Sequence, residues 1–322
     1  MIVVLLIAVA CERANAANEL GPIRSVVTFG DSWSDAGSFG TIYGTTPGSS
    51  WSQLLARSYG DDQTPFLFAD EGKPIRILGG LDYAQGGSRT ATPAKRAEAE
   101  DSIPHSAAVQ IRNHLRAFGR FHADQLIVLW TGCNDILAPF GNSAEGPLNA
   151  DQQIMNSKEG VSSAVYAAAE TSIRKAARDE SDLVRTLLDS GAVRVAVINI
   201  IDLGCQPNTN AAGVKLASRL TTIYNTSLTS GIPHDVRVLA VDADAIFTEA
   251  GRDRSARGFR HVVEDACANR SPVCGPADYV ETNANETYMF AGYGHLTQHS
   301  RRLLADAVAK LVNARWPSAL VH

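Results

Sequence analysis

The 322-residue chain carries short, unbroken apolar runs separated by longer stretches in which apolar residues recur at helical spacing. The runs are rich in Val, Ile and Leu without polar alternation, which is typical of strands buried on both faces of a sheet. The five runs are residues 25–29, 75–78, 125–130, 193–200 and 236–241. Strands that alternate with helices indicate an α/β fold, with a parallel sheet that binds ligands at the carboxyl ends of its strands.

Three stretches between these runs predict helices. Residues 106–118, 161–188 and 211–228 place apolar side chains at helical spacing, and Gly191 predicts the end of the longest one. No linker or repeat divides the sequence, so we expect one domain over residues 17–322. Two irregular stretches, residues 135–158 and 249–279, should rim the face where the strands end, because long loops in compact domains are usually functional.

Composition and charge disfavour several classes of function. With 45% hydrophobic and 20% charged residues, the chain is ordinary for a globular protein. Its 29 Lys and Arg against 34 Asp and Glu give a net charge of −5 without runs of like charge, so no nucleic-acid partner is expected. The eight His are scattered and form no C-x-x-C or H-E-x-x-H pattern, so no metal site is expected. Nothing in the sequence predicts a stable protein partner.

The N-terminal segment predicts export. Residues 1–10 are almost wholly apolar, and Ala-Asn-Ala at residues 14–16 is the pattern that a signal peptidase cuts after. We interpret residues 1–16 as the signal peptide of a secreted or periplasmic protein. A buried N-terminal strand and a lipoprotein anchored through Cys11 are the alternatives.

Four of the five cysteines follow residue 16, where an exported protein can oxidise them. Cys267 and Cys274 bracket a short loop, which predicts a local disulfide. Cys133 and Cys205 each follow an apolar run, and both a bridge between strand ends and two buried thiols remain open.

A serine follows the first predicted strand at a sharp turn. Ser32 lies in the sequence Gly-Asp-Ser-Trp-Ser-Asp-Ala-Gly at residues 30–37. A Ser at such a turn can act as a nucleophile, with backbone N–H groups facing the negative charge that develops. Taken alone, the segment is more typical of a helix N-cap.

Two further segments follow the second and third predicted strands at the same face. Residues 82–88 contain paired glycines, which let backbone N–H groups approach a ligand closely, although a plain tight turn fits equally. Residues 131–135 offer the side-chain amide of Asn134 as a donor. Three donors from three strand ends would then converge on one oxygen atom.

An imidazole near the other end of the chain completes the set. His295 lies in residues 292–297, just before an amphipathic final helix. Because the last helix of such a fold packs beside the first strand, His295 is placed to reach Ser32 as a general base.

In this order the four segments resemble the GDSL family of serine esterases and lipases, also called SGNH hydrolases. The matching motifs are Gly-Asp-Ser-x-Ser-Asp-x-Gly, Tyr-Ala-x-Gly-Gly, Gly-x-Asn-Asp and His-x-Thr, and they span nearly all of residues 17–322. The resemblance implies a secreted bacterial enzyme with a three-layer α/β/α, flavodoxin-like fold and a five-stranded parallel sheet. It implies no cofactor.

The resemblance also assigns roles to residues. It makes Ser32 the nucleophile and His295 the base, and it builds the oxyanion hole from the Ser32 N–H, the Gly87 N–H and the Asn134 side chain. The family has Asp three residues before the His, where this chain has Gly292.

Three explanations of that departure are open. The carbonyl of Gly292 accepts the His295 Nδ1–H and forms a Ser-His dyad, or a carboxylate from a nearby segment takes the place of the acid, or the protein is a weak or inactive hydrolase. The nearby carboxylates are Asp278, Glu281 and Glu286.

The expected function is hydrolysis of carboxylic esters through an acyl-enzyme. The sequence has no G-x-S-x-G, and neither G-x-G-x-x-G nor a P-loop follows the first strand, which disfavours an α/β-hydrolase and a nucleotide-binding protein. A catalytically weak or inactive carbohydrate- or lipid-binding relative and a polysaccharide acetylesterase are the alternatives.

Overall fold

A computed structural model of the chain describes residues 20–70, 72–94, 99, 101–138, 163–205, 207 and 211–319. The expected signal peptide at residues 1–16, including Cys11, lies outside this set, as does most of the stretch 135–158. Within these residues, none of the helices combines the length and the apolar character that a bilayer crossing requires.

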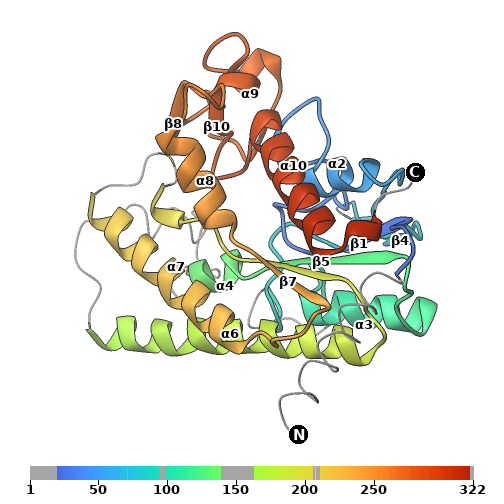
Figure 1. The fold of residues 1–322 in the computed structure, drawn as a ribbon. Coiled ribbons are helices and arrows are strands. Elements are labelled where there is room, and N and C mark those ends of the chain that lie inside the picture. The colour runs from blue at the N-terminus through green and yellow to red at the C-terminus, as the bar shows by residue number, and fades with distance from the viewer. Residues whose placement is uncertain are drawn as a thin grey trace, which may run out of the picture.

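Four parallel strands form the central sheet in the order β1-β5-β6-β7 (Figure 1). They are β1 (Ser25–Gly30), β5 (Gln125–Trp130), β6 (Val195–Ile198) and β7 (Val238–Val241). All six residues of β5 are buried, as an unbroken apolar run predicts. Gly30 pairs with Trp130, so β1 and β5 end level at the same edge of the sheet. The predicted parallel sheet is confirmed, but within the described residues it has four strands rather than the five expected.

The prediction that residues 75–78 form a strand of this sheet is wrong. That segment contains β4 (Arg76–Ile77), which is exposed and pairs antiparallel with β3 (Leu67–Phe68). The position beside β1 is taken instead by extended residues 81–85, which exchange backbone hydrogen bonds of 3.0 and 2.8 Å with Thr28. An apolar run shows that a segment is extended, but it does not say which sheet the segment joins.

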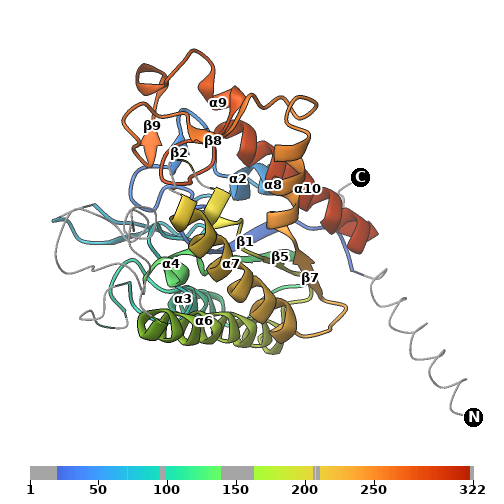
Figure 2. The ribbon, with the colours of Figure 1, turned by 90° about the vertical axis from the view of Figure 1, so that its left-hand side faces the viewer.

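Helices cover both faces of the sheet, as Figures 1 and 2 show. On one face lie α2 (Trp51–Arg57), α8 (Ala243–Arg252) and α10 (Gln298–Arg315), and on the other α3 (Ala107–Phe118), α6 (Ser163–Asp189) and α7 (Ala211–Gly231). The expected helices and the three-layer α/β/α arrangement are therefore confirmed. The final helix, α10, packs along α2, the helix that follows β1.

The stretch 249–279 is less irregular than predicted. It contributes one short strand to each of two further parallel pairs, and the described residues also include several short helices. These pairs are β8 (His261–Asp265) with β10 (Tyr288–Phe290) and β2 (Gly44–Thr45) with β9 (Val273–Cys274); the short helices are α4 (Cys133–Leu137), α9 (Ala284–Thr287), η2 (Leu203–Cys205), η3 (Pro276–Asp278) and η4 (Pro317–Ala319).

The predicted disulfide between Cys267 and Cys274 is confirmed, and it closes a loop that precedes the segment carrying His295. Cys133 and Cys205 form no disulfide with each other, since Cys133 is buried and Cys205 is exposed. Neither the bridge nor the pair of buried thiols therefore describes these two residues.

Candidate active site

Ser32 lies two residues beyond the end of β1, in a turn rather than in a helix. The N–H of Trp33 donates to the Asp31 carboxylate at 3.0 Å, and the N–H of Ser34 donates to the Asp31 carbonyl at 3.0 Å. The next helix begins only at Trp51, so the N-cap interpretation of this segment is wrong. The turn leaves the Ser32 side chain partly exposed at the carboxyl edge of the sheet.

His295 and Ser32 come together from opposite ends of the chain. His295 Nε2 lies 2.9 Å from Ser32 Oγ, and His295 Nδ1 lies 3.1 Å from the carbonyl oxygen of Gly292. Because a carbonyl can only accept, Nδ1 carries the hydrogen, and Nε2 of the neutral ring accepts from the Ser32 hydroxyl. Thr297 fixes the end of this segment, since its side chain caps α10 and donates to the Tyr288 carbonyl.

The three candidate carboxylates are engaged or exposed elsewhere. Glu286 pairs with Arg302, Glu281 accepts from the Thr287 hydroxyl at 3.2 Å, and Asp278 is exposed. Both ring nitrogens of His295 are already engaged by other groups. The contacts correspond to the first of the three explanations, a dyad oriented by the Gly292 carbonyl. The catalytic roles of these residues stay a prediction.

Close backbone packing explains why residue 292 carries no side chain. A Cβ atom at Gly292 would lie 2.1 Å from the carbonyl oxygen of Ser271, far inside the contact distance of two heavy atoms. Ser271 belongs to the loop closed by Cys267 and Cys274. The disulfide loop therefore occupies the space that the side chain of a triad acid needs.

Burial sets the protonation state of His295. The side chain is 9% exposed, and desolvation lowers the pKa of His295 to about 4, because burial penalises the charged form. The hydrogen bond to Gly292 raises this pKa and the positive charge of Arg301 lowers it, both by less than desolvation does. At neutral pH the ring is uncharged and is able to accept a proton.

The three expected oxyanion donors differ in whether another group of the protein already accepts a hydrogen bond from them. Among the described residues, nothing accepts a hydrogen bond from the backbone N–H of Ser32 or of Gly87. The Asn134 side chain donates one amide hydrogen to the Ser88 carbonyl at 2.9 Å, and its second amide hydrogen remains for a ligand. The hydrogen bond to Ser88 also fixes the orientation of this amide beside Gly87.

Two buried side chains to which the sequence analysis assigned no role hold the donor segments together. Gln110 of α3 accepts from the Gly30 N–H and donates to the Gly30 carbonyl and to Ser88 Oγ, each at 2.9 Å. Asp35 accepts from the N–H groups of Ser38 at 2.7 Å and Gly86 at 2.9 Å, which ties the Ser32 turn to the Gly87 loop. The signal for Gln110 was a polar residue between Val109 and Ile111, but its partners lie up to 80 residues away.

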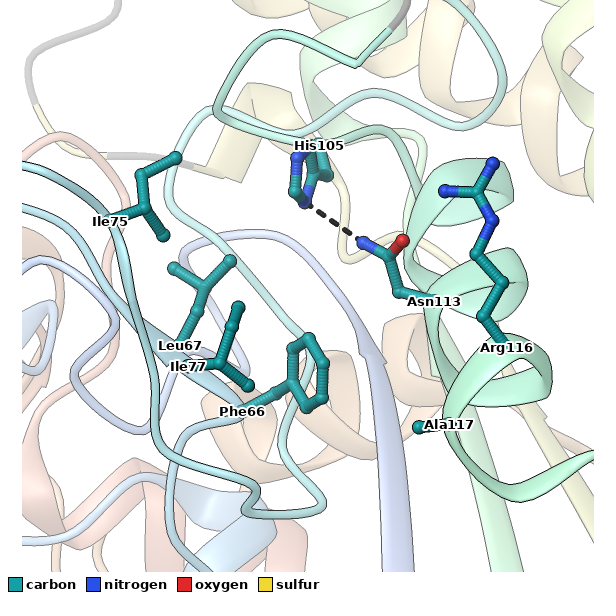
Figure 3. Close-up of a pocket in the computed structure, with 8 residues that line it drawn as sticks. All are labelled: Phe66, Leu67, Ile75, Ile77, His105, Asn113, Arg116 and Ala117. Atoms are coloured by element: carbon teal, nitrogen blue, oxygen red, sulfur yellow. Dashed lines mark hydrogen bonds between the residues drawn. The ribbon is translucent and has the colours of Figure 1, made fainter.

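A groove of about 460 Å³ lies between the β3–β4 pair and α3 (Figure 3). One wall is formed by Phe66, Leu67, Ile75 and Ile77, and the other by His105, Asn113, Arg116 and Ala117. His105 links the groove to the Gly87 loop, since its N–H donates to Gln85 Oε1 at 2.8 Å and its carbonyl accepts from Ser88 Oγ at 2.5 Å. The wall that includes His105 is therefore connected to the loop that carries Gly87.

The described residues contain no group of three His, Cys, Asp or Glu side chains that could hold a metal ion. The groups that meet around Ser32 at the carboxyl edge of the sheet include a hydroxyl, an imidazole and neutral N–H donors. Such a set suits acyl transfer, which needs a nucleophile, a base and donors for an oxyanion.

Comparisons with known proteins point to the same chemistry. The chain is 25% identical over 205 residues to the phosphatidylcholine-sterol acyltransferase of Aeromonas hydrophila, an alignment that covers 62% of this chain and 53% of that protein. The aligned part thus spans about half the length of this relative. The family described as GDSL-like lipase/acylhydrolase matches residues 26–308, which include Ser32, Gly87, Asn134 and His295. Because this match covers most of its length, the chain belongs to the GDSL-like lipase/acylhydrolase family.

Proposed function

We propose that the protein hydrolyses carboxylic esters through an acyl-enzyme on Ser32. His295 Nε2 takes the Ser32 proton while Oγ attacks the ester carbonyl, and the Ser32 N–H, the Gly87 N–H and the Asn134 amide stabilise the oxyanion. The 2.9 Å contact between Ser32 Oγ and His295 Nε2 carries the proposal. Membership of a family of ester hydrolases and acyltransferases supports it.

The second half of the reaction uses the same groups in reverse. His295 gives its proton to the leaving alcohol, and a water molecule then repeats the attack on the acyl-enzyme. The Gly292 carbonyl, 3.1 Å from Nδ1, holds the required tautomer and stabilises the imidazolium by hydrogen bonding. Loss of the triad Asp in a serine protease costs about 10⁴ in kcat because the tautomer is wrong, a loss that a carbonyl acceptor avoids.

Hydrolysis of p-nitrophenyl acetate and butyrate tests the proposal. Ser32→Ala should lower kcat by about 10⁶, and Asn134→Ala should lower kcat by about 10² to 10³ with little change in KM. Asn285→Ala is the matched control, because the Asn285 amide donates to Glu286 at 3.0 Å and, in the part of the chain that the structure describes, to no group of the proposed site. Equal rates for the wild type and Ser32→Ala would reject an esterase in favour of a non-catalytic carbohydrate- or lipid-binding protein.

Transfer of the acyl group to an alcohol is a second candidate function. The Aeromonas relative is named an acyltransferase, and the chemistry is identical up to the acyl-enzyme. Chromatography of the products formed with and without an added acceptor alcohol separates the two. A new ester that forms at the expense of free acid would favour transfer.

The groove beside the Gly87 loop supports acyl chains longer than acetyl. In the proposed reaction the leaving alcohol must lie at His295, so the acyl chain extends away from that side chain. The groove, which His105 links to the Gly87 loop, offers an apolar wall with Ile75 44% and Ile77 64% exposed. A polysaccharide acetylesterase would instead show its highest kcat/KM with acetyl esters.

Export remains part of the proposal. A disulfide between Cys267 and Cys274 is typical of an oxidising compartment, which agrees with a signal peptide at residues 1–16. Mass spectrometry of the protein recovered from the periplasm or medium should find Ala17 as the first residue. A lipid-modified N-terminus at Cys11 would favour the anchored alternative.

We also propose that residues 17–322 form one domain, which should unfold in a single transition.

A further inference from the structure

The His295 imidazole stacks on an aromatic ring that neither the sequence motifs nor the reaction steps single out. The rings of Tyr43 and His295 have centroids 5.3 Å apart and planes inclined by 23°. Ser32 and Gly292 engage the two nitrogens in the plane of the imidazole. Those contacts fix the ring edge, whereas Tyr43 covers one face and opposes tilting out of that plane.

Buried hydrogen bonds hold the Tyr43 backbone in place. The guanidinium of Arg301, which is 1% exposed, donates to the carbonyls of Tyr43, Thr45 and Ser49. Burial lowers the pKa of Arg301 to about 10, so this side chain is still charged at neutral pH. A buried charge persists only when hydrogen bonds compensate it, which makes the Arg301 contacts a strong constraint on the loop that carries Tyr43.

The hydroxyl end of Tyr43 is confined from the other side. A Cβ atom at Gly86 would lie 2.2 Å from the Tyr43 hydroxyl oxygen, so the phenol ring packs directly on this glycine. The Gly86 N–H in turn donates to Asp35 at 2.9 Å. Tyr43 thus lies between the imidazole and the loop of the proposed oxyanion donor Gly87.

We propose that Tyr43 is a positioning residue for His295, fixing the plane of the imidazole and excluding water from one of its faces. The proposal rests on the function proposed above, in which His295 is the base. In a triad, a carboxylate both orients the imidazole and stabilises its charge. Here the Gly292 carbonyl supplies the in-plane contact, and Tyr43 supplies the orientation that a single carbonyl acceptor leaves free.

The charged and titratable groups near the imidazole define the pH dependence. Arg301 is the charged group that acts on His295, and Asp35 acts on Tyr43, whose pKa is raised to about 12, mainly by burial. Tyr43 is therefore neutral throughout the working range and contributes its ring rather than a charge. Because desolvation dominates the low pKa of His295, loss of the ring should hydrate the imidazole and raise its pKa toward 6.5.

The test replaces Tyr43 and measures both the imidazole and the turnover. In Tyr43→Leu, we expect NMR titration of the His295 ring to give a pKa at least about one unit higher than in the wild type. We expect kcat at pH 8, where the imidazole is neutral in both proteins, to fall about 10- to 100-fold with little change in KM. Tyr43→Phe, which preserves the ring, should keep both the pKa of His295 and the kcat close to their wild-type values.

Matched variants separate positioning from folding. Tyr166→Leu removes a tyrosine ring that contacts Arg219 on the opposite layer, and it should leave the His295 titration unchanged. Tyr43→Met fills similar space without a planar ring and is the second test variant, which should show the same changes as Tyr43→Leu and replaces it if Tyr43→Leu does not fold. A wild-type kcat at pH 8 in Tyr43→Leu, or an equal loss in Tyr43→Phe, overturns the proposal. The proposed function would fail if the wild type showed no turnover that depends on Ser32. The role of Tyr43 is tested separately, and an unchanged pKa of His295 in Tyr43→Leu would overturn it.

Discussion

Gly292 shows how one residue can change the design of a catalytic centre. Its carbonyl oxygen accepts from the backbone N–H of His295 and from the Nδ1–H of the same residue, both at 3.1 Å. Unlike a carboxylate, which titrates at about pH 4, a backbone carbonyl has no titration in the working pH range. The acid limb of the pH–rate profile should therefore contain no step from a triad acid and should include the protonation of His295, whose pKa burial lowers to about 4.

Restoring the acid should damage the site rather than repair it. In Gly292→Asp, the new Cβ would meet the Ser271 carbonyl at 2.1 Å, so the disulfide loop must move. We expect kcat to fall at least about tenfold and stability to fall by about 1 to 3 kcal/mol, the usual cost of overpacking. Ester kinetics and urea unfolding measure the two effects.

The control for this substitution is Gly251→Asp in α8, where a Cβ atom would have no heavy atom within 4 Å. The same change in chemistry should there leave kcat as it is. A Gly292→Asp protein with wild-type or higher kcat would mean that the carboxylate reaches His295 after all.

At the level of elements, β1 and α3 are joined by an aromatic cluster that contains a second buried histidine. The His114 ring stacks on Phe121 with centroids 4.5 Å apart, and it also contacts Phe29, Tyr83 and Phe118. Burial lowers the pKa of His114 to about 4. An uncharged imidazole thus acts as one more ring of the core.

The cluster predicts a loss of stability in acid. Because the folded pKa lies below the unfolded value of about 6.5, the unfolded chain binds more protons between these two values. Stability should be full above pH 6.5 and should fall as the pH drops toward 4, with His114 costing about 2 kcal/mol between pH 7 and 4.5. His295 contributes with the same sign.

Urea unfolding at pH 7 and 4.5 checks this prediction. His114→Phe should lose less stability across that interval than the wild type, and His234→Phe, at an exposed position, should lose as much as the wild type. Identical losses in all three proteins would assign the acid sensitivity to other groups.

The disulfide loop is the second element whose integrity the site requires. The Cys267–Cys274 bond closes a short loop that places Ser271 against Gly292. Closing so short a loop is worth about 2 kcal/mol, so Cys274→Ser should lower the free energy of unfolding by that amount. It should also lower kcat several-fold, because Gly292 loses its support.

Dithiothreitol should reproduce both effects of Cys274→Ser in the wild-type protein. Cys205→Ser, which alters an exposed thiol outside the disulfide, should respond to the reductant as the wild type does. A Cys274→Ser protein with unchanged kcat would show that the loop holds its position without the bond.

For the whole molecule, sequence reasoning succeeded where the signal is local. The unbroken apolar runs of β1 and β5 predicted buried parallel strands, and strands that end level bring Ser32 and Asn134 to one edge. It failed for residues 75–78, whose apolar side chains proved to be exposed. It also missed Gln110 and Tyr43, since their partners are distant in sequence and no periodicity encodes contacts between loops.

The length of acyl chain that the protein accepts depends on distant parts of the chain. The groove lies between the β3–β4 pair and α3, which are far apart in the sequence. If the acyl chain lies along this groove, Ile77→Asp should lower kcat/KM for octanoyl esters about tenfold or more and leave acetyl esters within about twofold. Each buried methylene contributes about 0.8 kcal/mol, or about fourfold in kcat/KM, and an acetyl group is too short to reach Ile77. Val263→Asp on β8 is the matched control, since Val263 is 55% exposed outside the groove. Equal losses for acetyl and octanoyl esters in Ile77→Asp would mean that the chain lies elsewhere and that the groove serves another purpose.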